Sequence, residues 1–160
     1  STTYLQASID IIQMIAQRKM FQSSKDELSL ILFGTIDTAN ELWDGSSDDY
    51  RHITVARQLS QVDWKLIDFI QNNINSTTLE GDVLDGILVA SNHFHEEVNK
   101  RKVFKDKRII ILTDFSSTAN EEGKLNVICN GLAKNHIRVD VISPFTEDDS
   151  NNNNNESNSP

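Results

Sequence analysis

Thr113 and Asp114 follow a run of four large apolar residues, from Ile109 to Leu112. Such a run, preceded by charged residues, is typical of a strand that is buried on both faces, as in a parallel sheet. A carboxylate at the carboxyl end of such a strand lies where open α/β sheets bind their ligands. Asp114 is therefore well placed for chemistry, and its oxygens are the type of ligand that Mg²⁺ prefers.

The other reactive side chains do not form a catalytic or metal-binding pattern. His93 and His95 are two residues apart in a predicted helix, so they point to different faces and do not easily share one ion. The single cysteine, Cys129, excludes a zinc cluster, and its place on an apolar stripe predicts an inert thiol in the core. Neither a phosphate-binding glycine loop nor a Gly-x-Ser-x-Gly elbow is present. We therefore predict no catalytic residue, no cofactor and no enzymatic activity.

Composition and charge limit the possible partners. The 160 residues, 38% hydrophobic and 24% charged, fit one globular domain, and no apolar run approaches the roughly 20 residues that a membrane helix needs. The net charge of −9 argues against a dominant nucleic-acid-binding surface, because binding to phosphates needs clustered positive charge. One basic cluster indicates either a solvated helix end or a contact for DNA or nuclear import. Its members are Lys100, Arg101, Lys102, Lys105, Lys107 and Arg108.

Apolar periodicity predicts alternating helices and strands. The expected helices cover residues 4–18, 63–74, 82–98 and 120–134, and the expected strands cover residues 28–33, 52–56, 108–112 and 137–141. Short connections between them imply a three-layer α/β fold, a doubly wound, mostly parallel sheet with helices on both faces. The first helix has no strand before it, so we expect the α/β domain, residues 1–146, to lack its first strand. Residues 147–160, rich in asparagine and acids, are expected to form a disordered tail.

Several short segments resemble a von Willebrand factor A-like domain of Rossmann-like topology. More closely, they resemble the amino-terminal α/β domain of the large (eighty-kilodalton) subunit of the Ku heterodimer. The segments keep the family's order and nearly its spacing, and they are residues 15–21, 25–35, 53–55, 82–89, 113–117 and 144–145. The resemblance implies a nuclear protein of DNA double-strand-break repair by non-homologous end joining and of telomere maintenance.

Type A domains that bind ligands through a metal combine Asp-x-Ser-x-Ser after the first strand, a threonine from a later loop and an Asp after the central strand. Asp114 matches the last of these. The first motif is absent from the 160 residues, and the threonine loop reads Glu80-Gly81-Asp82-Val83, with Thr77 and Thr78 just before it. We interpret Thr113 and Asp114 as the remnant of a degenerate site and assign no metal. The alternative, a metal-dependent ligand-binding domain of an adhesion or scaffold protein, would need that first motif upstream.

The Ku resemblance also implies partners. The large subunit and the small subunit together form Ku, which encircles DNA ends largely through regions outside this domain. The domain itself is implied to dock end-joining factors through short peptides that contain basic and aromatic residues; apolar anchors give affinity, and an acid can pair with a basic residue. The positions that match the family's peptide groove are Leu42, Tyr50, Asp82, Ile87 and Leu88. The alternative leaves Ile87 and Leu88 partly in the core and Leu42 as a loop residue without a partner.

The predicted helix at residues 120–134 offers a second candidate surface. Its outer face carries Glu122, Asn126 and Lys134. In related Ku subunits the equivalent helix engages partners, including chromatin factors at telomeres, so the resemblance implies a partner contact here. A plain solvated helix face is the alternative.

Overall fold

The helices and strands follow one another in the order that the predicted segments give. The computed structural model describes residues 3–22, 24–100, 103–116 and 122–144, without the side chain of Glu122. In this part of the chain the elements are α1 (Tyr4–Phe21), β1 (Glu27–Phe33), β2 (Ile53–Gln61), α2 (Trp64–Asn72), α3 (Val83–Asn99), β3 (Lys107–Leu112), α4 (Glu122–Lys134) and β4 (Ile137–Ile142). The pairs β1–β2 and α2–α3 are consecutive elements of one kind and do not alternate. The predicted tail at residues 147–160 lies outside the described residues. No helix in the described ranges is long and apolar enough to cross a membrane.

Two aspartates fix the starts of α2 and α3. Asp63 accepts a hydrogen bond from the backbone N–H of Leu66 at 2.9 Å. Asp82 accepts one from the backbone N–H of Leu84 at 2.7 Å, so α3 begins where the sequence predicts. A side-chain cap of this kind stabilises a helix by about 1 kcal/mol.

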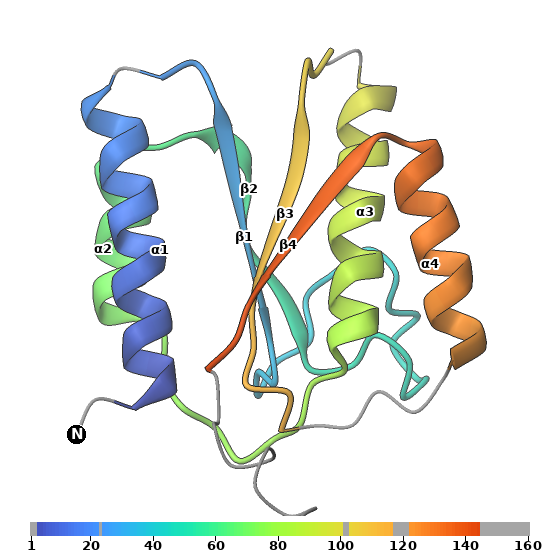
Figure 1. Cartoon of the computed structure of the whole chain (residues 1–160). Coiled ribbons are helices and arrows are strands. Elements are labelled where there is room, and N and C mark those ends of the chain that lie inside the picture. The colour runs from blue at the N-terminus through green and yellow to red at the C-terminus, as the bar shows by residue number, and fades with distance from the viewer. Residues whose placement is uncertain (1–2, 23, 101–102, 117–121, 145–160) are drawn as a thin grey trace, which may run out of the picture.

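The strands form two separate two-stranded sheets. β1 pairs with β2 in the antiparallel sense, and β3 pairs with β4 in the parallel sense. β1, β3 and β4 point the same way and β2 the opposite way (Figure 1), so the predicted mostly parallel arrangement holds for strand direction but not for pairing. Residues 34–52, which join β1 to β2, contain no helix of the kind that usually connects parallel neighbours, and β1 and β2 pair in the antiparallel sense.

Contacts outside the sheets hold the two sheets together. Among the described strands, β1 and β3 each pair on one side only. α3 contacts both of them, and the Tyr4 hydroxyl at the start of α1 donates to the carbonyl oxygen of Ile142, at the end of β4, at 2.8 Å. A further strand before α1 stays a prediction from the sequence.

The helices lie on both sides of the strands, with α1 and α2 on one side and α3 and α4 on the other (Figure 1). The core is correspondingly divided in two. The first core, between α1, α2 and β1, consists of Ala16, Leu30, Leu66, Ile67 and Ile70. The second core, between α3, β3 and α4, consists of Val83, Leu84, Ile111 and Ile128. This layered arrangement agrees with the predicted α/β class.

β3 is less buried than its sequence predicts. Ile111 is buried, whereas Ile109, Ile110 and Leu112 are half-buried. Ile109 and Ile111 pack in the second core, but Ile110 and Leu112 alternate to the other face and belong to neither core. Because α1 and α2 pack over β1 and β2 instead of that face, the prediction of a strand buried on both faces is wrong.

Cys129 is exposed on the surface of α4. Ile128 is buried and Leu132 packs beside it, so these residues mark the inward side of α4. Cys129 follows Ile128 by one residue, which turns it about 100° around the helix. The prediction of a core thiol is wrong because α4 packs on one side only, against α3 and β4.

Candidate functional site

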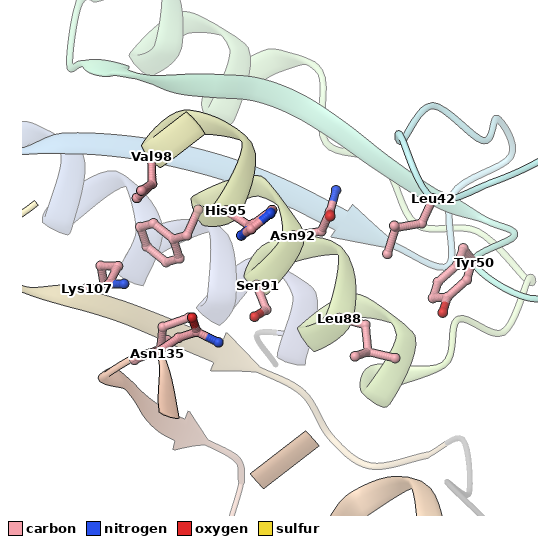
Figure 2. A pocket seen from close by; sticks show the side chains of 11 residues that line it. Leu42, Tyr50, Leu88, Ser91, Asn92, His95, Val98, Lys107 and Asn135 are labelled. Carbon is pink, nitrogen blue, oxygen red and sulfur yellow. The ribbon is translucent and has the colours of Figure 1, made fainter. Parts of the chain in front are cut away.

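A groove of about 420 Å³ runs along one face of α3 (Figure 2). α3 contributes side chains spaced three and four residues apart, which share one face of a helix. The connection between β1 and β2 lines one end, and the start of β3 with the turn before β4 lines the other. The lining residues are Leu42, Tyr50, Leu88, Ser91, Asn92, Phe94, His95, Val98, Lys107, Asn135 and Ile137.

The structure brings together three of the five predicted groove residues, Leu42, Tyr50 and Leu88. Figure 2 shows Leu42 and Tyr50 at the end of the groove that holds Leu88 on α3. Ile87 packs against the second core instead. Asp82 does not line the groove, and its carboxylate caps the first turn of α3. Local helix packing and capping therefore give Ile87 and Asp82 structural roles, and their part in ligand binding stays a prediction.

Asn40 organises the loop that carries Leu42 and Tyr50. Its Oδ1 accepts from the backbone N–H groups of Leu42 and Trp43, both at 3.1 Å. Its Nδ2 donates to the carbonyl oxygens of Tyr50 and Ile53, both at 2.9 Å. One half-buried side chain thus joins both ends of the loop and fixes the separation of the two groove residues.

Asp85 connects the same loop to two helices. It is 5% exposed, and its Oδ2 accepts from the backbone N–H of Tyr50 at 3.0 Å. Tyr50 has φ 59°, a left-handed conformation that is uncommon for a bulky residue and needs such support. The other oxygen of Asp85 pairs with Lys124 Nζ of α4 at 2.6 Å. Asp85 therefore fixes the backbone of Tyr50, whose side chain lines the groove.

The two ends of the groove differ in polarity. Leu42, Tyr50 and Leu88 form an apolar end, whereas the other end combines Lys107 and Asn135 with the apolar Val98 (Figure 2). Asn135 Nδ2 donates to the carbonyl oxygen of Gly131 at 2.8 Å. Lys107 is half-buried, and within the described ranges its side chain has no hydrogen bond or ion pair. No lining residue in those ranges carries a carboxylate, so Lys107 sets the charge of this end.

A smaller hollow of about 250 Å³ shares Leu42 and Asn92 with the groove. His93 lines this hollow and is 5% exposed. Its Nε2 accepts from the backbone N–H of Leu59 at 3.1 Å, which fixes α3 against β2. This contact gives His93 a structural role, while His95 lies exposed along the groove.

Thr113 and Asp114 lie at the carboxyl end of β3, as predicted, but their oxygens hold the local turn. Thr113 Oγ1 accepts from the backbone N–H of Phe115 at 3.1 Å, and Asp114 Oδ1 accepts from that of Ser116 at 3.0 Å. The hydrogen bond from Ser116 lowers the pKa of Asp114 below its ordinary value. In the described part of the chain, no three His, Cys, Asp or Glu side chains are grouped so that they could hold a metal ion.

Thr77, the nearby candidate threonine, is also committed to backbone contacts. Its hydroxyl donates to the carbonyl oxygen of Gly34 and accepts from the backbone N–H of Leu79. The backbones touch beside it, because a Cβ on Gly81 would lie 2.2 Å from the nitrogen of Gly34. Close backbone contact of this kind requires glycine. The side chains around this strand end therefore serve the turn geometry.

The basic cluster is only partly described. Lys100 pairs with Glu97 at 3.1 Å, and Lys105 is exposed. Arg101 and Lys102 lie outside the described residues. The ion pair of Lys100 at the end of α3 fits the interpretation of a solvated helix end. A contact with DNA or an import factor stays a prediction.

α4 presents the second candidate surface to solvent. Asn126 and Lys134 are exposed, and Val127 beside them is 71% exposed. Glu122 is the first residue of α4, but its side chain is not described. This face of α4 is exposed to solvent, and the binding of a partner protein to it stays a prediction.

Sequence comparison gives these two surfaces a family context. Residues 1–154 match the family described as the Ku70/Ku80 N-terminal alpha/beta domain. The chain is 30% identical over 148 residues to X-ray repair cross-complementing protein 5 of Xenopus laevis, covering 92% of this chain and 20% of that protein. It is 27% identical over 142 residues to the protein of the same name from Dictyostelium discoideum, covering 89% of this chain and 17% of that protein.

A plant protein is also similar. The chain is 26% identical over 144 residues to the ATP-dependent DNA helicase 2 subunit KU80 of Oryza sativa subsp. japonica, covering 86% of this chain and 20% of that protein. The chain thus spans about a fifth of the length of these curated relatives.

Proposed function

Because this chain belongs to the Ku70/Ku80 N-terminal alpha/beta domain family, we propose that it is a peptide-docking domain of a Ku-type large subunit. It acts without catalysis and holds repair factors close to the DNA ends that the whole complex binds. The observation that supports this function best is the grouping of Leu42, Tyr50 and Leu88 at one end of an open groove.

The groove has the properties of a docking site for short peptides. Its volume of about 420 Å³ falls within the range of roughly 300–1,000 Å³ that is usual for ligand sites. Leu42, Tyr50 and Leu88 are half-buried, so a bulky ligand side chain can bury the apolar surface that they leave uncovered. An aromatic residue of the docked peptide would pack against this apolar end of the groove.

The loop beside the groove lowers the cost of binding. Asn40 and Asp85 hold Leu42 and Tyr50 by hydrogen bonds before any ligand arrives. A loop that is already ordered loses less conformational entropy on binding. A basic residue of the same peptide would lie toward Asp82, at the amino end of α3, where the carboxylate is exposed.

The wider role concerns the full Ku complex. We assign DNA-end binding and pairing with the small subunit mainly to regions outside these 160 residues, which fits their net charge of −9. Non-homologous end joining and telomere maintenance, in the nucleus, are the processes that this domain serves. The name of the rice relative includes a helicase, but a phosphate-binding glycine loop is absent from the 160 residues, which favours a domain without ATP chemistry.

Substitution of Leu42 tests the docking function. The probes are fluorescein-labelled peptides of eight to ten residues that combine Lys or Arg with Trp or Phe. Leu42→Glu places a charge against the bound aromatic side chain and is expected to weaken binding at least ~30-fold, which corresponds to about 2 kcal/mol. Fluorescence anisotropy of the full chain measures the affinity.

Ile36→Glu is the matched control, because Ile36 is 74% exposed in the same connection and does not line the groove. It should bind like the unaltered chain. Equal affinities for the Leu42 and Ile36 variants, with both folded by circular dichroism, would remove the groove from the function. A panel in which no peptide binds the unaltered chain would contradict the docking function itself.

A further inference from the structure

The groove along α3 has one apolar end and one cationic end. The apolar end is formed by Leu42, Tyr50 and Leu88, and the cationic end by Lys107 beside Asn135 (Figure 2). Lys107 is the first residue of β3, and its backbone pairs in register with Ile137 of β4. A rigid sheet therefore presents this cation to the groove.

The length of the groove sets the length of the ligand. Leu88 and Val98 both line it and are ten residues apart in α3, which is almost three helical turns. At 1.5 Å per residue this separation is about 15 Å. An extended peptide rises about 3.3 Å per residue, so about five residues reach from one end to the other.

We propose that the groove selects an extended peptide segment of about five residues, with a bulky apolar side chain at one end and a carboxylate at the other. The apolar side chain packs on Leu42, Tyr50 and Leu88, and the carboxylate pairs with Lys107. This inference rests on the proposed docking function and adds the charge that the ligand carries at the far end of the groove.

The unpaired side chain of Lys107 is the observation that supports a carboxylate in the ligand. Two neighbouring cations of the described chain are already paired, Lys100 with Glu97 at 3.1 Å and Arg108 with Asp140 at 2.5 Å, while Lys105 is exposed and lies outside the groove. Lys107 has no such partner in the described ranges, and no described lining residue is an acid. A lysine that is half-buried as a residue gains more from an anionic partner than a fully exposed lysine does.

The carboxylate preference is separate from the basic residue expected near Asp82. Asp82 caps the amino end of α3, whereas Lys107 lies near the carboxyl half of that helix. A docked peptide can therefore carry a basic residue before its aromatic anchor and an acidic residue beyond it. The two ends of α3 then fix the direction in which the peptide lies.

Calorimetric titration of short peptides into the full chain tests the inference. The probes are the acetylated, amidated pentapeptide Trp-Ser-Gly-Ser-Asp, the same peptide ending in Lys, and the reversed sequences of both. Of the two acidic peptides, the one that binds more tightly is expected to bind about tenfold more tightly than the lysine peptide of the same direction. The reason is that a lysine in the peptide and Lys107 repel each other. Equal affinities, tighter binding of the lysine peptides, or no binding by any of the four would overturn the inference.

Charge reversal at Lys107 identifies the responsible residue. Lys107→Glu should invert the preference so that the lysine peptide binds more tightly, and Lys107→Gln should bring the ratio close to one. Lys105→Glu is the matched control, because Lys105 is an exposed cation two residues earlier that does not line the groove. It should leave the ratio unchanged, whereas an equal effect of both reversals would show a general field effect and overturn the inference.

Two further outcomes separate this inference from the proposed function. Peptides that bind the Leu42→Glu variant more weakly, but bind the Lys107 variants as tightly as the unaltered chain, would leave the docking function in place. They would overturn the carboxylate site at Lys107. A pentathymidylate that binds more tightly than the acidic peptide, and competes with it, would assign Lys107 to nucleic acid and overturn the inference.

Discussion

The groove along α3 and the carboxyl end of β3 both carry residues suited to binding, but they use them differently. At the end of β3, Thr113 and Asp114 direct their oxygens to neighbouring backbone N–H groups. In the groove, Leu42 and Leu88 are half-buried with apolar surface uncovered, and Lys107 has no partner in the described ranges. The proposed binding site is therefore the region in which residues other than the groove-lining ones hold the local structure.

Asn40 and Asp85 are what makes this difference possible. Their side chains form hydrogen bonds with the backbone of the loop, so the side chains of Leu42 and Tyr50 are not needed to hold it and can contact a ligand. At the strand end no such division exists, because the residues with suitable oxygens also hold the turn. Changes to Asn40 or Asp85 should therefore affect the groove and leave the strand end as it is.

Removal of the Asp85 carboxylate should have the largest effect. Asp85→Ala deletes a buried ion pair with Lys124 and the support of the Tyr50 N–H, and it should lower the free energy of unfolding by about 3 kcal/mol. Urea denaturation measures this loss. Asp48→Ala is the control in the same loop, because its ion pair with Arg51 is exposed and should contribute little. Similar stabilities of the two variants would show that Asp85 does not support the groove.

Asn40→Ala should have an intermediate effect that is confined to the loop. Four hydrogen bonds are lost, and the expected cost is about 1–2 kcal/mol, because water replaces part of them. Hydrogen exchange at the Leu42 and Trp43 amides should become faster, while exchange at Thr113 should not change. Asn75→Ala, which removes one long, exposed hydrogen bond, is the control. Unchanged exchange at Leu42 would contradict the role of Asn40.

Acid should have the smallest effect, at the tip of the same loop. The backbone N–H groups of Ser47 and Ser46 lower the pKa of Asp44 to about 2 from its ordinary value of 3.8. A lowered pKa means that this turn is fully stabilised above pH 3.8 and loses its support as pH falls through about 2. The Ser46 and Ser47 amide signals in NMR spectra should follow that titration, and Asp44→Asn should abolish it. A midpoint near 3.8 in the unaltered chain would show that these hydrogen bonds are absent in solution.

The elements of the fold can be predicted from sequence because their signals are local. Asp63 and Asp82 cap the helices that follow them, and apolar spacing marks the strands. The pairing of the strands is not local, and neither is burial: Cys129 and Ile110 follow the expected periodicity yet lack the neighbours that would cover them. Secondary structure was therefore predictable, and sheet pairing was not.

The candidate site shows the same limit. Leu42, Tyr50 and Leu88 could be named through the family resemblance, and the structure places them together. Asp85 was out of reach, because it meets Tyr50 and Lys124 across 35 and 39 residues of chain. Its only signal in the sequence is an acid among the apolar residues that open α3. Lys107 was visible as part of a basic cluster, but only the packing of β3 beside α3 separates it from its neighbours.

NMR spectroscopy of the chain during titration with one of the aromatic, basic peptides tests the central claim most directly. We predict that the methyl signals of Leu42 and Leu88 and the amide signal of Tyr50 move together and saturate with a single dissociation constant. The amide signals of Thr113 and Asp114 should stay in place. Shifts centred on Thr113 and Asp114, with Leu42 and Leu88 unmoved, would contradict the assignment of binding to the groove.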